Sequence, residues 1–271
     1  MAIDVLAEIL TNRALSADYN VVEFAAPDLA RLAEPGQFVM VKTSLGNDPL
    51  LRRPFSIFEI LRDATGQPRG VSILNKRVGV GTNLIYSTKP GDRLNVLGPL
   101  GQPWPRQTAD EHWMVAGGVG LAPFVTLAET LAKTNARMRL FYGGRSASDL
   151  YYASLFETLG ATLVLTTEDG SQGEKGRVTA PLERALSARG TTNVTLYTCG
   201  PTPMMRAVAT LGAAHHCQTF VSLEQVMGCG MGGCYSCVVQ VNDHATPHFV
   251  RSCIEGPVFD ASRIIWDALV H

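Results

Sequence analysis

The sequence predicts a multi-domain β plus α/β protein with an N-terminal antiparallel β-barrel, a parallel-sheet α/β domain and a small cysteine-rich C-terminal segment. Short alternating apolar runs separated by turn residues fill positions 1–103, as in a small antiparallel barrel. Strand and helix patterns alternate over 104–222, as they do in βαβ units. Four of the six cysteines fall within residues 223–271, a segment too short for a generous core of its own.

Length, composition and charge agree with this division. The chain has 271 residues, of which 46% are hydrophobic, and a formal net charge of -1. This suits two domains with real cores and gives no support for a nucleic-acid partner, which requires a basic surface. There is no apolar run of about 18 residues and no basic leader before an apolar stretch, so we expect no membrane span and no signal peptide. The expected location is the cytoplasm, where thiols stay reduced.

The first domain shows strand patterns between clear turn signals. The turns are expected at 34–37 and 89–92, where proline and glycine stand together. Strands are expected at 21–24, 38–42, 56–59, 71–75 and 93–96.

The second domain alternates buried strands with amphipathic helices, which predicts a parallel sheet covered on both faces. Strands are expected at 114–116, 138–142, 162–167 and 195–199. Helices are expected at 123–133, 149–159, 180–187 and 203–211.

The spacing of four cysteines is the strongest chemical signal in the chain. Cys229, Cys234 and Cys237 form a C-x₄-C-x₂-C run, and Cys253 follows after fifteen intervening residues. Plant-type [2Fe–2S] proteins use this run and take their fourth ligand from further along the chain. The surrounding glycines let the backbone wrap closely, with N–H groups toward the sulfurs. The alternative is a structural zinc site, but zinc frames usually use paired C-x₂₋₄-C units.

Two short motifs in the first domain suit a flavin dinucleotide. Arg53 can grip a pyrophosphate, and Gly81 with Thr82 can offer N–H groups and a hydroxyl at a helix start. Phe55, which follows Pro54, can lie beside an isoalloxazine. Ser56, a candidate catalytic residue, can donate to the flavin N5.

With this Arg-x-aromatic-Ser motif ahead of an α/β domain, the chain resembles the ferredoxin–NADP reductase superfamily. The resemblance implies FAD in the barrel. It also implies a middle flavin contact in a short strand, at Leu74, Asn75 and Lys76, although asparagine is less typical there.

Two turns in the second domain suit a nicotinamide cofactor. Gly117, Gly118 and Gly120 follow a strand and precede a helix, where backbone can approach a diphosphate. Cys199, Gly200 and Pro201 occupy the same position after another strand. The superfamily places this Cys-Gly-Pro beside the nicotinamide, so the resemblance implies a positioning role for Cys199. A small buried thiol at a turn is the alternative.

Acidic residues after a third strand favour NAD over NADP. Glu168 and Asp169 stand where NADP-dependent superfamily members tend to place a cation for the 2′-phosphate. Carboxylates repel that phosphate and can accept from a ribose hydroxyl. Arg145, near another strand end, complicates this prediction.

The order of motifs extends the resemblance over most of the chain. RRPFS, GPLG, GGVG, YTCGP, the cysteine run and SCIEGPVF together resemble the electron-transfer subunits of class B dihydroorotate dehydrogenases. That resemblance implies a separate FMN-containing catalytic subunit, a 2:2 heterotetramer and a role in pyrimidine biosynthesis. Electrons would cross the [2Fe–2S] cluster to FAD and then to NAD⁺. No orotate chemistry is expected in this chain, and no protein acid or base is expected to be essential for hydride transfer.

Three other functions share some of these features. One is the related subunit of a ferredoxin-dependent transhydrogenase or of a hydrogenase. Another is an oxygenase reductase with a fused ferredoxin, which predicts a much wider gap before the last cysteine. The third is a zinc-stabilised binding module that is not an enzyme.

Overall fold

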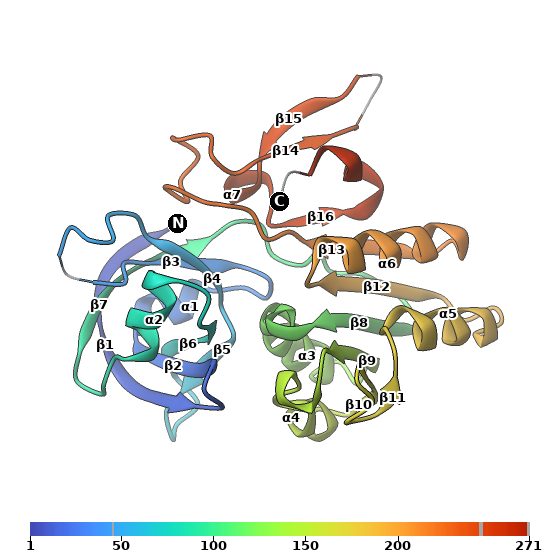
Figure 1. The fold of residues 1–271 in the computed structure, drawn as a ribbon, viewed down its shortest axis with the longest axis horizontal. Coiled ribbons are helices and arrows are strands. Elements are labelled where there is room, and N and C mark those ends of the chain that lie inside the picture. Colours follow the sequence, from blue (N-terminus) through green and yellow to red (C-terminus); the bar gives the residue numbers. More distant parts are fainter. Residues whose placement is uncertain (45, 244–245, 270–271) are drawn as a thin grey trace.

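In the computed structural model, which describes residues 1–44, 46–243 and 246–269, two seven-stranded sheets lie side by side beneath a small hairpin (Figure 1). The first sheet is antiparallel, with the order β4-β3-β7-β1-β2-β6-β5. Its strands are β1 Ile3–Ala14, β2 Tyr19–Ala25, β3 Phe38–Val41, β4 Arg53–Ser56, β5 Glu59–Arg62, β6 Pro68–Lys76 and β7 Arg93–Leu100.

This first sheet curls around an apolar core as a half-barrel, since no pairing joins β4 to β5 in the part of the chain described. Inward-facing residues of the strands fill that core, among them Phe24, Val39 and Ile73. Two short helices, α1 Pro27–Leu32 and α2 Val80–Tyr86, accompany the sheet.

Two strand expectations for this domain need correction. The twelve-residue strand β1 was not predicted. The strand expected at 56–59 is wrong, because β4 ends at Ser56 and β5 begins at Glu59. Between them the chain changes partners: the Ile57 amide donates to the carbonyl oxygen of Gln37, and the Phe58 amide donates to that of Ser72. The two buried residues therefore cross from one end of the sheet to the other.

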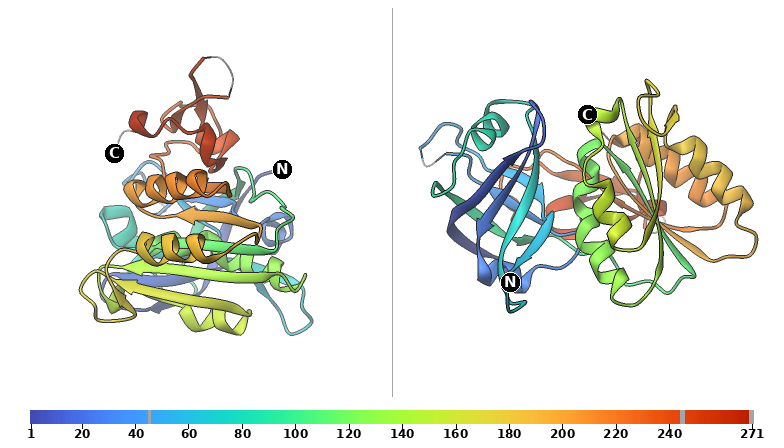
Figure 2. Two further views of the ribbon diagram at one scale, coloured as in Figure 1. Left: turned by 90° about the vertical axis from the view of Figure 1, so that its right-hand side faces the viewer. Right: turned by 90° about the horizontal axis from the view of Figure 1, so that it is seen from below.

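The second sheet has the order β11-β10-β9-β8-β12-β13-β16 and is parallel except at β16. Figure 2 shows helices on both of its faces. Its strands are β8 Glu111–Gly117, β9 Arg137–Gly144, β10 Ala161–Thr167, β11 Glu174–Lys175, β12 Val194–Cys199, β13 Gln218–Ser222 and β16 Val258–Asp260. Its helical elements are η1 Gly118–Phe124, α3 Val125–Ala132, η2 Ala147–Asp149, α4 Ala153–Thr158, α5 Thr179–Ala188 and α6 Thr202–Ala214.

Two helices of this domain start differently from the prediction. After β8 the chain winds at once into the 3₁₀-helix η1, which contains Pro123, and the α-helix α3 begins only at Val125. The helix expected at 149–159 is split into η2 and α4, because Tyr152 between them adopts a left-handed φ of 58°.

The C-terminal segment is attached to both sheets. It forms the hairpin of β14 Val238–Val241 and β15 His248–Arg251, the short helix α7 Ser252–Glu255, the strand β16 and the 3₁₀-turns η3 Ala261–Arg263 and η4 Trp266–Ala268. Its β16 extends the second sheet beside β13. The Gln102 amide, just beyond the first sheet, donates to the Gly256 carbonyl at 2.6 Å. Among the described residues, no helix is long and apolar enough to span a membrane.

Candidate functional site

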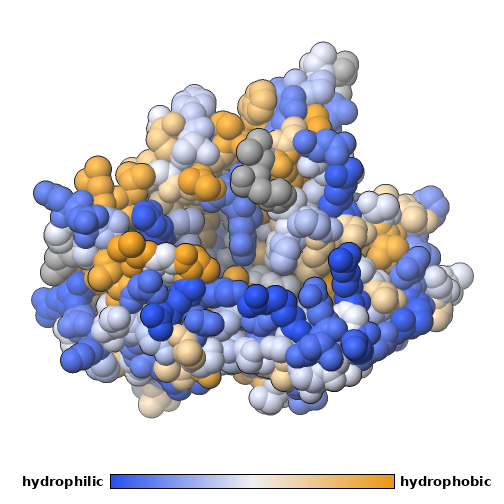
Figure 3. All heavy atoms as spheres, viewed as in Figure 1, coloured by the Kyte–Doolittle hydropathy of each residue, from blue (hydrophilic) through white to orange (hydrophobic). Residues whose placement is uncertain are grey.

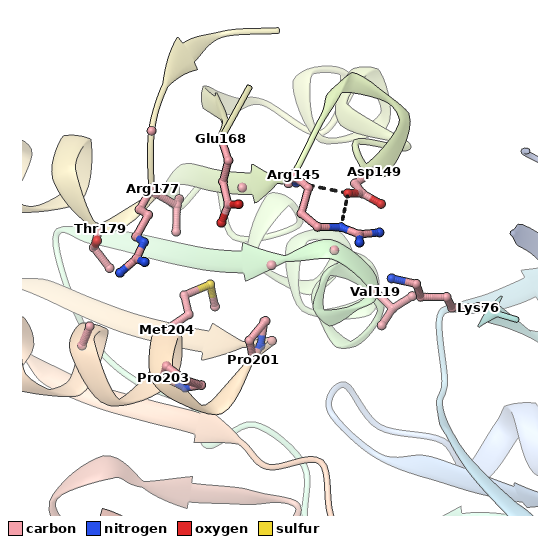
Figure 4. A pocket seen from close by; sticks show the side chains of 18 of the residues that line it. Lys76, Val119, Arg145, Asp149, Glu168, Arg177, Thr179, Pro201, Pro203 and Met204 are labelled. Carbon is pink, nitrogen blue, oxygen red and sulfur yellow. Dashed lines mark hydrogen bonds and ion pairs between the residues drawn. The ribbon is translucent and has the colours of Figure 1, made fainter. Parts of the chain in front are cut away.

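A cleft of about 480 Å³ lies at the carboxyl ends of the parallel strands, facing the first sheet. Its lining comes mainly from the turns that follow β8, β9, β10, β12 and β13. Tyr19 and Lys76 enter from the first sheet. Lys76 points toward the charged side chains of the α/β domain, which Figure 4 labels as Arg145, Asp149, Glu168 and Arg177. Open α/β sheets bind ligands at this edge, beside the point where the strand order reverses, here between β8 and β12.

Backbone packs directly on backbone at that point. A Cβ built on Gly120 would lie 2.3 Å from the Cys199 carbonyl oxygen, and one on Gly200 would lie 3.0 Å from the Gly117 nitrogen. Only glycine therefore fits at these two turns. Gly117, Gly118 and Gly200 line the cleft together with Pro201, whereas Gly120 packs against the Cys199 backbone.

Cys199 lies behind the cleft surface rather than on it. The residue is 1% exposed and packs in the core of the α/β domain. Burial, and then the nearby Glu224, raise the pKa of the Cys199 thiol well above its ordinary value. The thiol is therefore neutral and has no acid–base role at physiological pH.

The two predicted acids behave differently. Glu168 lines the cleft. Asp169 instead closes its own turn, accepting hydrogen bonds from the hydroxyl and the amide of Ser171 at 2.6 and 2.9 Å, which lower its pKa. Arg145 also lines the cleft, together with Arg177, which the sequence analysis missed.

The predicted flavin motif and helix start come together around Arg53. A Cβ on Gly81, in the first turn of α2, would lie 3.3 Å from the Arg53 Cγ and Nε atoms. The Arg53 guanidinium donates to the carbonyl oxygens of Leu51 and Arg52 at 2.8 and 3.2 Å. A fixed positive charge therefore lies against the amide-rich end of a helix, which suits a diphosphate.

The hydroxyl of Thr43, which was not among the predicted flavin contacts, completes this cradle. The Thr43 Oγ1 atom is buried and has no hydrogen-bond partner among the described residues. The Thr43 methyl group lies 3.4 Å from the Cβ position of Gly81. An orphaned buried hydroxyl is costly unless a ligand satisfies it. By contrast, the Thr82 hydroxyl caps α2: it accepts from the amides of Val78 and Gly79 and donates its own hydrogen to the Gly79 carbonyl at 3.0 Å, so it is not free for phosphate.

Strand β4 carries the rest of the flavin motif beside β3. Pro54 pairs with Met40 and Ser56 with Phe38. Side chains alternate along a strand, so these four share one face. Phe55 lies on the other face and packs against the core of the half-barrel.

The end of β6 connects the flavin cradle with the cleft. Leu74 is buried, and the Asn75 amide donates to the Asn20 side-chain oxygen at 2.7 Å and to the Thr82 carbonyl at 3.0 Å. Lys76, the next residue, lines the cleft. All three predicted residues therefore lie between the two candidate cofactor sites.

The four clustered cysteines contact one another two by two. Cys234 and Cys229 are free thiols that form a hydrogen bond. Hydrogen bonds from Ser236 and then from Cys229 lower the pKa of Cys234 to about 6. Cys253 and Cys237 form the second hydrogen-bonded pair. The Met231 amide donates to the Cys229 sulfur at 3.3 Å, as the loop glycines predict.

Two thiol pairs suit two metal ions better than one. Cys229 pairs with Cys234, and Cys237 pairs with Cys253. A zinc site requires four ligands around one ion, whereas each iron of a [2Fe–2S] cluster takes two thiolates.

The loop at 228–237, called the cysteine loop below, packs on the first sheet together with Cys253. Met227, Cys237 and Cys253 form one apolar cluster with four residues of β3 and β7, namely Phe38, Met40, Leu97 and Leu100. A Cβ on Gly230 would lie 2.5 Å from the Met40 Cγ atom. The loop therefore contacts the face of β3 that Pro54 and Ser56 share.

Comparisons with known proteins match this arrangement. The iron–sulfur cluster binding domain of dihydroorotate dehydrogenase B matches residues 224–265, and the oxidoreductase NAD-binding domain matches residues 114–210. The dihydroorotate dehydrogenase B (NAD(+)) electron transfer subunit of Desulforamulus reducens is 39% identical, over 96% of this chain and 98% of its own length. That of Bacillus caldolyticus is 38% identical over 86% of this chain and 88% of its own.

Solved structures agree on the fold. A chain of the NADH-dependent reduced ferredoxin-NADP oxidoreductase superposes with a TM-score of 0.84 at 26% identity, over 97% of this chain and 91% of that one. A ferredoxin NADP⁺ reductase from Neisseria gonorrhoeae, with bound FAD and NADP, gives 0.66 at 15% identity, over 78% and 91%. The fold is therefore ferredoxin–NADP reductase-like, with a β half-barrel and a parallel-sheet α/β domain.

Proposed function

Since the chain belongs to the family of dihydroorotate dehydrogenase B electron transfer subunits, we propose that its four clustered cysteines hold the [2Fe–2S] cluster, its half-barrel FAD and its cleft NAD(H). The chain is an electron-transfer subunit and an NAD(H)-linked flavin oxidoreductase subunit. We propose further that it works in the cytoplasm, where reduced thiols are free to hold iron.

The half-barrel binds FAD through the cradle of Arg53, Gly81 and Thr43. Arg53 and the first-turn amides of α2 hold the diphosphate, and the Thr43 hydroxyl gains the partner that it otherwise lacks. When bound, FAD supplies the chemistry, because a flavin exchanges electrons singly with an iron–sulfur cluster and as a hydride with NAD⁺. Ser56, on β4, serves as a hydrogen-bonding and positioning residue for the flavin ring.

The cleft binds NAD(H) with its diphosphate over Gly117 and Gly118 and its nicotinamide toward Gly200 and Pro201. Glu168, after β10, accepts from the adenosine ribose and disfavours a 2′-phosphate. Cys199 supports this surface from behind through its packing.

One observation carries the electron-transfer proposal: the cysteine loop packs on β3, next to the strand that holds the flavin motif. Neighbouring strands lie about 4.8 Å apart, so the residues that would hold the cluster lie next to the strand whose residues would hold the flavin. This arrangement supports direct transfer between them.

The partner docks over the exposed apolar side chains that surround the cysteine loop. Met231, Tyr235 and Phe249 are 61%, 62% and 67% exposed, and Ile254 is 38% exposed. Apolar side chains gather on this upper part of the molecule (Figure 3). An exposed apolar patch of this kind marks an interaction site. We assign it to the FMN-containing dihydroorotate dehydrogenase catalytic subunit, in a 2:2 heterotetramer that serves pyrimidine biosynthesis.

A second partner has specific support. The NADH-dependent ferredoxin-NADP oxidoreductase chain superposes over nearly the whole length of this chain. A subunit of a ferredoxin-dependent transhydrogenase is therefore the alternative, with a different protein on the same patch.

The test begins with the visible spectrum of the anaerobically purified chain, followed by NADH. Flavin bands and broad iron–sulfur absorption, both bleached by NADH, are expected. The catalytic subunit is then added with dihydroorotate and NAD⁺, and NADH formation is expected only with both chains present. A colourless zinc protein would contradict the cofactor assignment. Reduction by NADH without coupling to the catalytic subunit would favour the transhydrogenase alternative.

A further inference from the structure

A chain of hydrogen bonds joins the half-barrel to the glycine loop of the cleft. The Tyr19 hydroxyl, on β2, donates to the Asp149 Oδ1 atom at 2.9 Å. The Tyr142 hydroxyl, on β9, lies 2.9 Å from the Asp149 carbonyl oxygen and 3.2 Å from the Gly118 carbonyl oxygen. Three side chains therefore connect the flavin domain with the loop over which NAD(H) binds.

The central carboxylate depends on these partners. The Asp149 side chain is 8% exposed. Burial raises its pKa, but the Tyr19 hydroxyl and the Arg145 amide, 3.1 Å from Oδ2, lower it on balance, so the group is ionised. When a buried carboxylate loses a hydrogen bond, its desolvation is no longer compensated and the ionised form is destabilised. Each hydrogen-bond donor to Asp149 therefore contributes to keeping it ionised.

The residues of this hydrogen-bond chain lie beside the candidate cofactor sites. Tyr19 and Asp149 line the cleft, and the Lys76 ammonium lies 5.1 Å from the centre of the Tyr19 ring. Figure 4 shows Asp149 with its bonds to Arg145, and Lys76 approaching from the half-barrel. The adjacent Asn75 holds the first turn of α2.

We propose that Tyr19 and Asp149 are positioning residues for hydride transfer, which set the nicotinamide-binding loop at the right distance from the flavin-bearing half-barrel. The inference rests on the proposed cofactor sites. Hydride transfer requires the donor and acceptor atoms about 3–3.5 Å apart. Because the two cofactors are held by different domains, that distance depends on the contacts between the domains.

Other contacts keep the domains together when this bond is removed. The Tyr151 hydroxyl donates to the Ser16 Oγ atom at 2.9 Å. Trp104 bridges the domains too, because its amide donates to the Pro35 carbonyl at 2.8 Å and its indole to the Pro123 carbonyl at 3.0 Å. Loss of the Tyr19 hydroxyl is therefore expected to loosen the alignment without separating the domains.

The test is Tyr19→Phe in the holoprotein, with anaerobic stopped-flow reduction by NADH. Phenylalanine keeps the ring under Lys76 and against Tyr151, whose centroid lies 4.9 Å away. We expect flavin reduction to slow by about 10- to 100-fold, and the flavin–nicotinamide charge-transfer absorption to weaken. FAD content is expected to stay unchanged, and the Kd for NADH to change by less than about threefold, because the Tyr19 hydroxyl is already engaged by Asp149.

Two further variants sharpen the result. Asp149→Asn removes the charge at the same link, so the double variant is expected to be no slower than the worse single one. Tyr151→Phe is the matched control, because its hydroxyl also bridges the two domains, through Ser16, but is not part of the link through Asp149 to the glycine loop.

The outcomes separate this inference from the proposed function. Wild-type reduction rates and an unchanged charge-transfer band in Tyr19→Phe, with only a lower melting temperature, would overturn the positioning role. Equal slowing in Tyr151→Phe would do the same. A wild-type flavin that NADH does not reduce would instead contradict the proposed function itself.

Discussion

Cys199 illustrates how a residue beside a reactive site can act through its shape. It ends β12, immediately before the glycine that lines the cleft, and its carbonyl oxygen lies against Gly120. Its thiol is buried and neutral, so a role as nucleophile or proton donor has no support. What remains is packing: a small side chain lets two turns approach closely.

The pH dependence of hydride transfer should therefore be independent of Cys199. Because its pKa is raised, the thiol stays protonated over the whole range below that pKa, including about pH 6 to 9. Cys199→Ala is expected to cost about 1 kcal/mol of stability and to leave the shape of the pH–rate profile unchanged. Stopped-flow flavin reduction at several pH values measures this. A limb that is present in the wild type near pH 8 and absent in the variant would show a titrating Cys199.

Glu168 and Asp169 form a natural pair for testing nucleotide choice. Glu168 lines the cleft together with Arg145 and Arg177, so its charge opposes binding of a 2′-phosphate to those arginines. Glu168→Gln is expected to raise kcat/KM for NADPH relative to NADH by about tenfold, which is ~1.4 kcal/mol. Asp169→Asn is the control, because Asp169 is engaged with Ser171 and should leave that ratio unchanged. Equal ratios in all three proteins would remove Glu168 from the specificity argument.

At the scale of elements, the turns after β8 and β12 decide the cleft. Their backbones pack so closely that the side chain of residue 120 must be a hydrogen atom. The two turns come from segments about 80 residues apart in sequence and meet because β8 and β12 are neighbours in the sheet. A change in one turn should therefore disturb the other.

Gly120→Ala tests that coupling. The added methyl group would meet the Cys199 carbonyl at 2.3 Å, so the turns must move apart. We expect a loss of about 1–3 kcal/mol of stability and weaker NADH binding, with FAD retained. Thermal unfolding and NADH titration measure the two effects. Gly46→Ala, where nothing lies within 4 Å of the new Cβ, is the control and should behave as the wild type.

Features set by local sequence could be predicted, and those set by distant packing could not. The cysteine loop and the glycine turns have their chemistry encoded in a few adjacent residues, and the structure brings the expected residues together. Thr43 and the Tyr19–Asp149 bond were missed, because each depends on segments that meet only in the fold; the two residues of that bond are 130 positions apart. The break between β4 and β5 at residues 57–58 was not predicted for the same reason, because it arises where the chain changes its hydrogen-bonding partner from one distant strand to another.

At the scale of the whole molecule, the C-terminal segment connects the two domains. Its Cys237 and Cys253 pack on the half-barrel, whereas its β16 completes the edge of the α/β sheet. The inner face of the β14–β15 hairpin, with Val239, Val241 and Val250, packs against Met205 of α6 in a separate apolar cluster. The loop at 228–237 carries Cys229, Cys234 and Cys237, and α7 carries Cys253.

Removing the iron should therefore loosen one part of the segment and leave the other in place. Without metal, the half-buried Cys229 and the exposed Cys234 lose the iron that would join them, and the loop at 228–237 is expected to open. Amide hydrogen exchange, compared between the holoprotein and the anaerobically chelated protein, should rise by at least about tenfold at 228–237 and in α7. Exchange in β16 should stay protected, because its pairing with β13 and the bond from Gln102 to Gly256 do not involve the cluster. Cys217→Ser, treated in the same way, should give the same pattern, because Cys217 packs in the α/β core. Uniform deprotection of β8, β12 and β16 would show instead that the cluster supports the whole fold, and unchanged exchange at 228–237 would place the metal elsewhere.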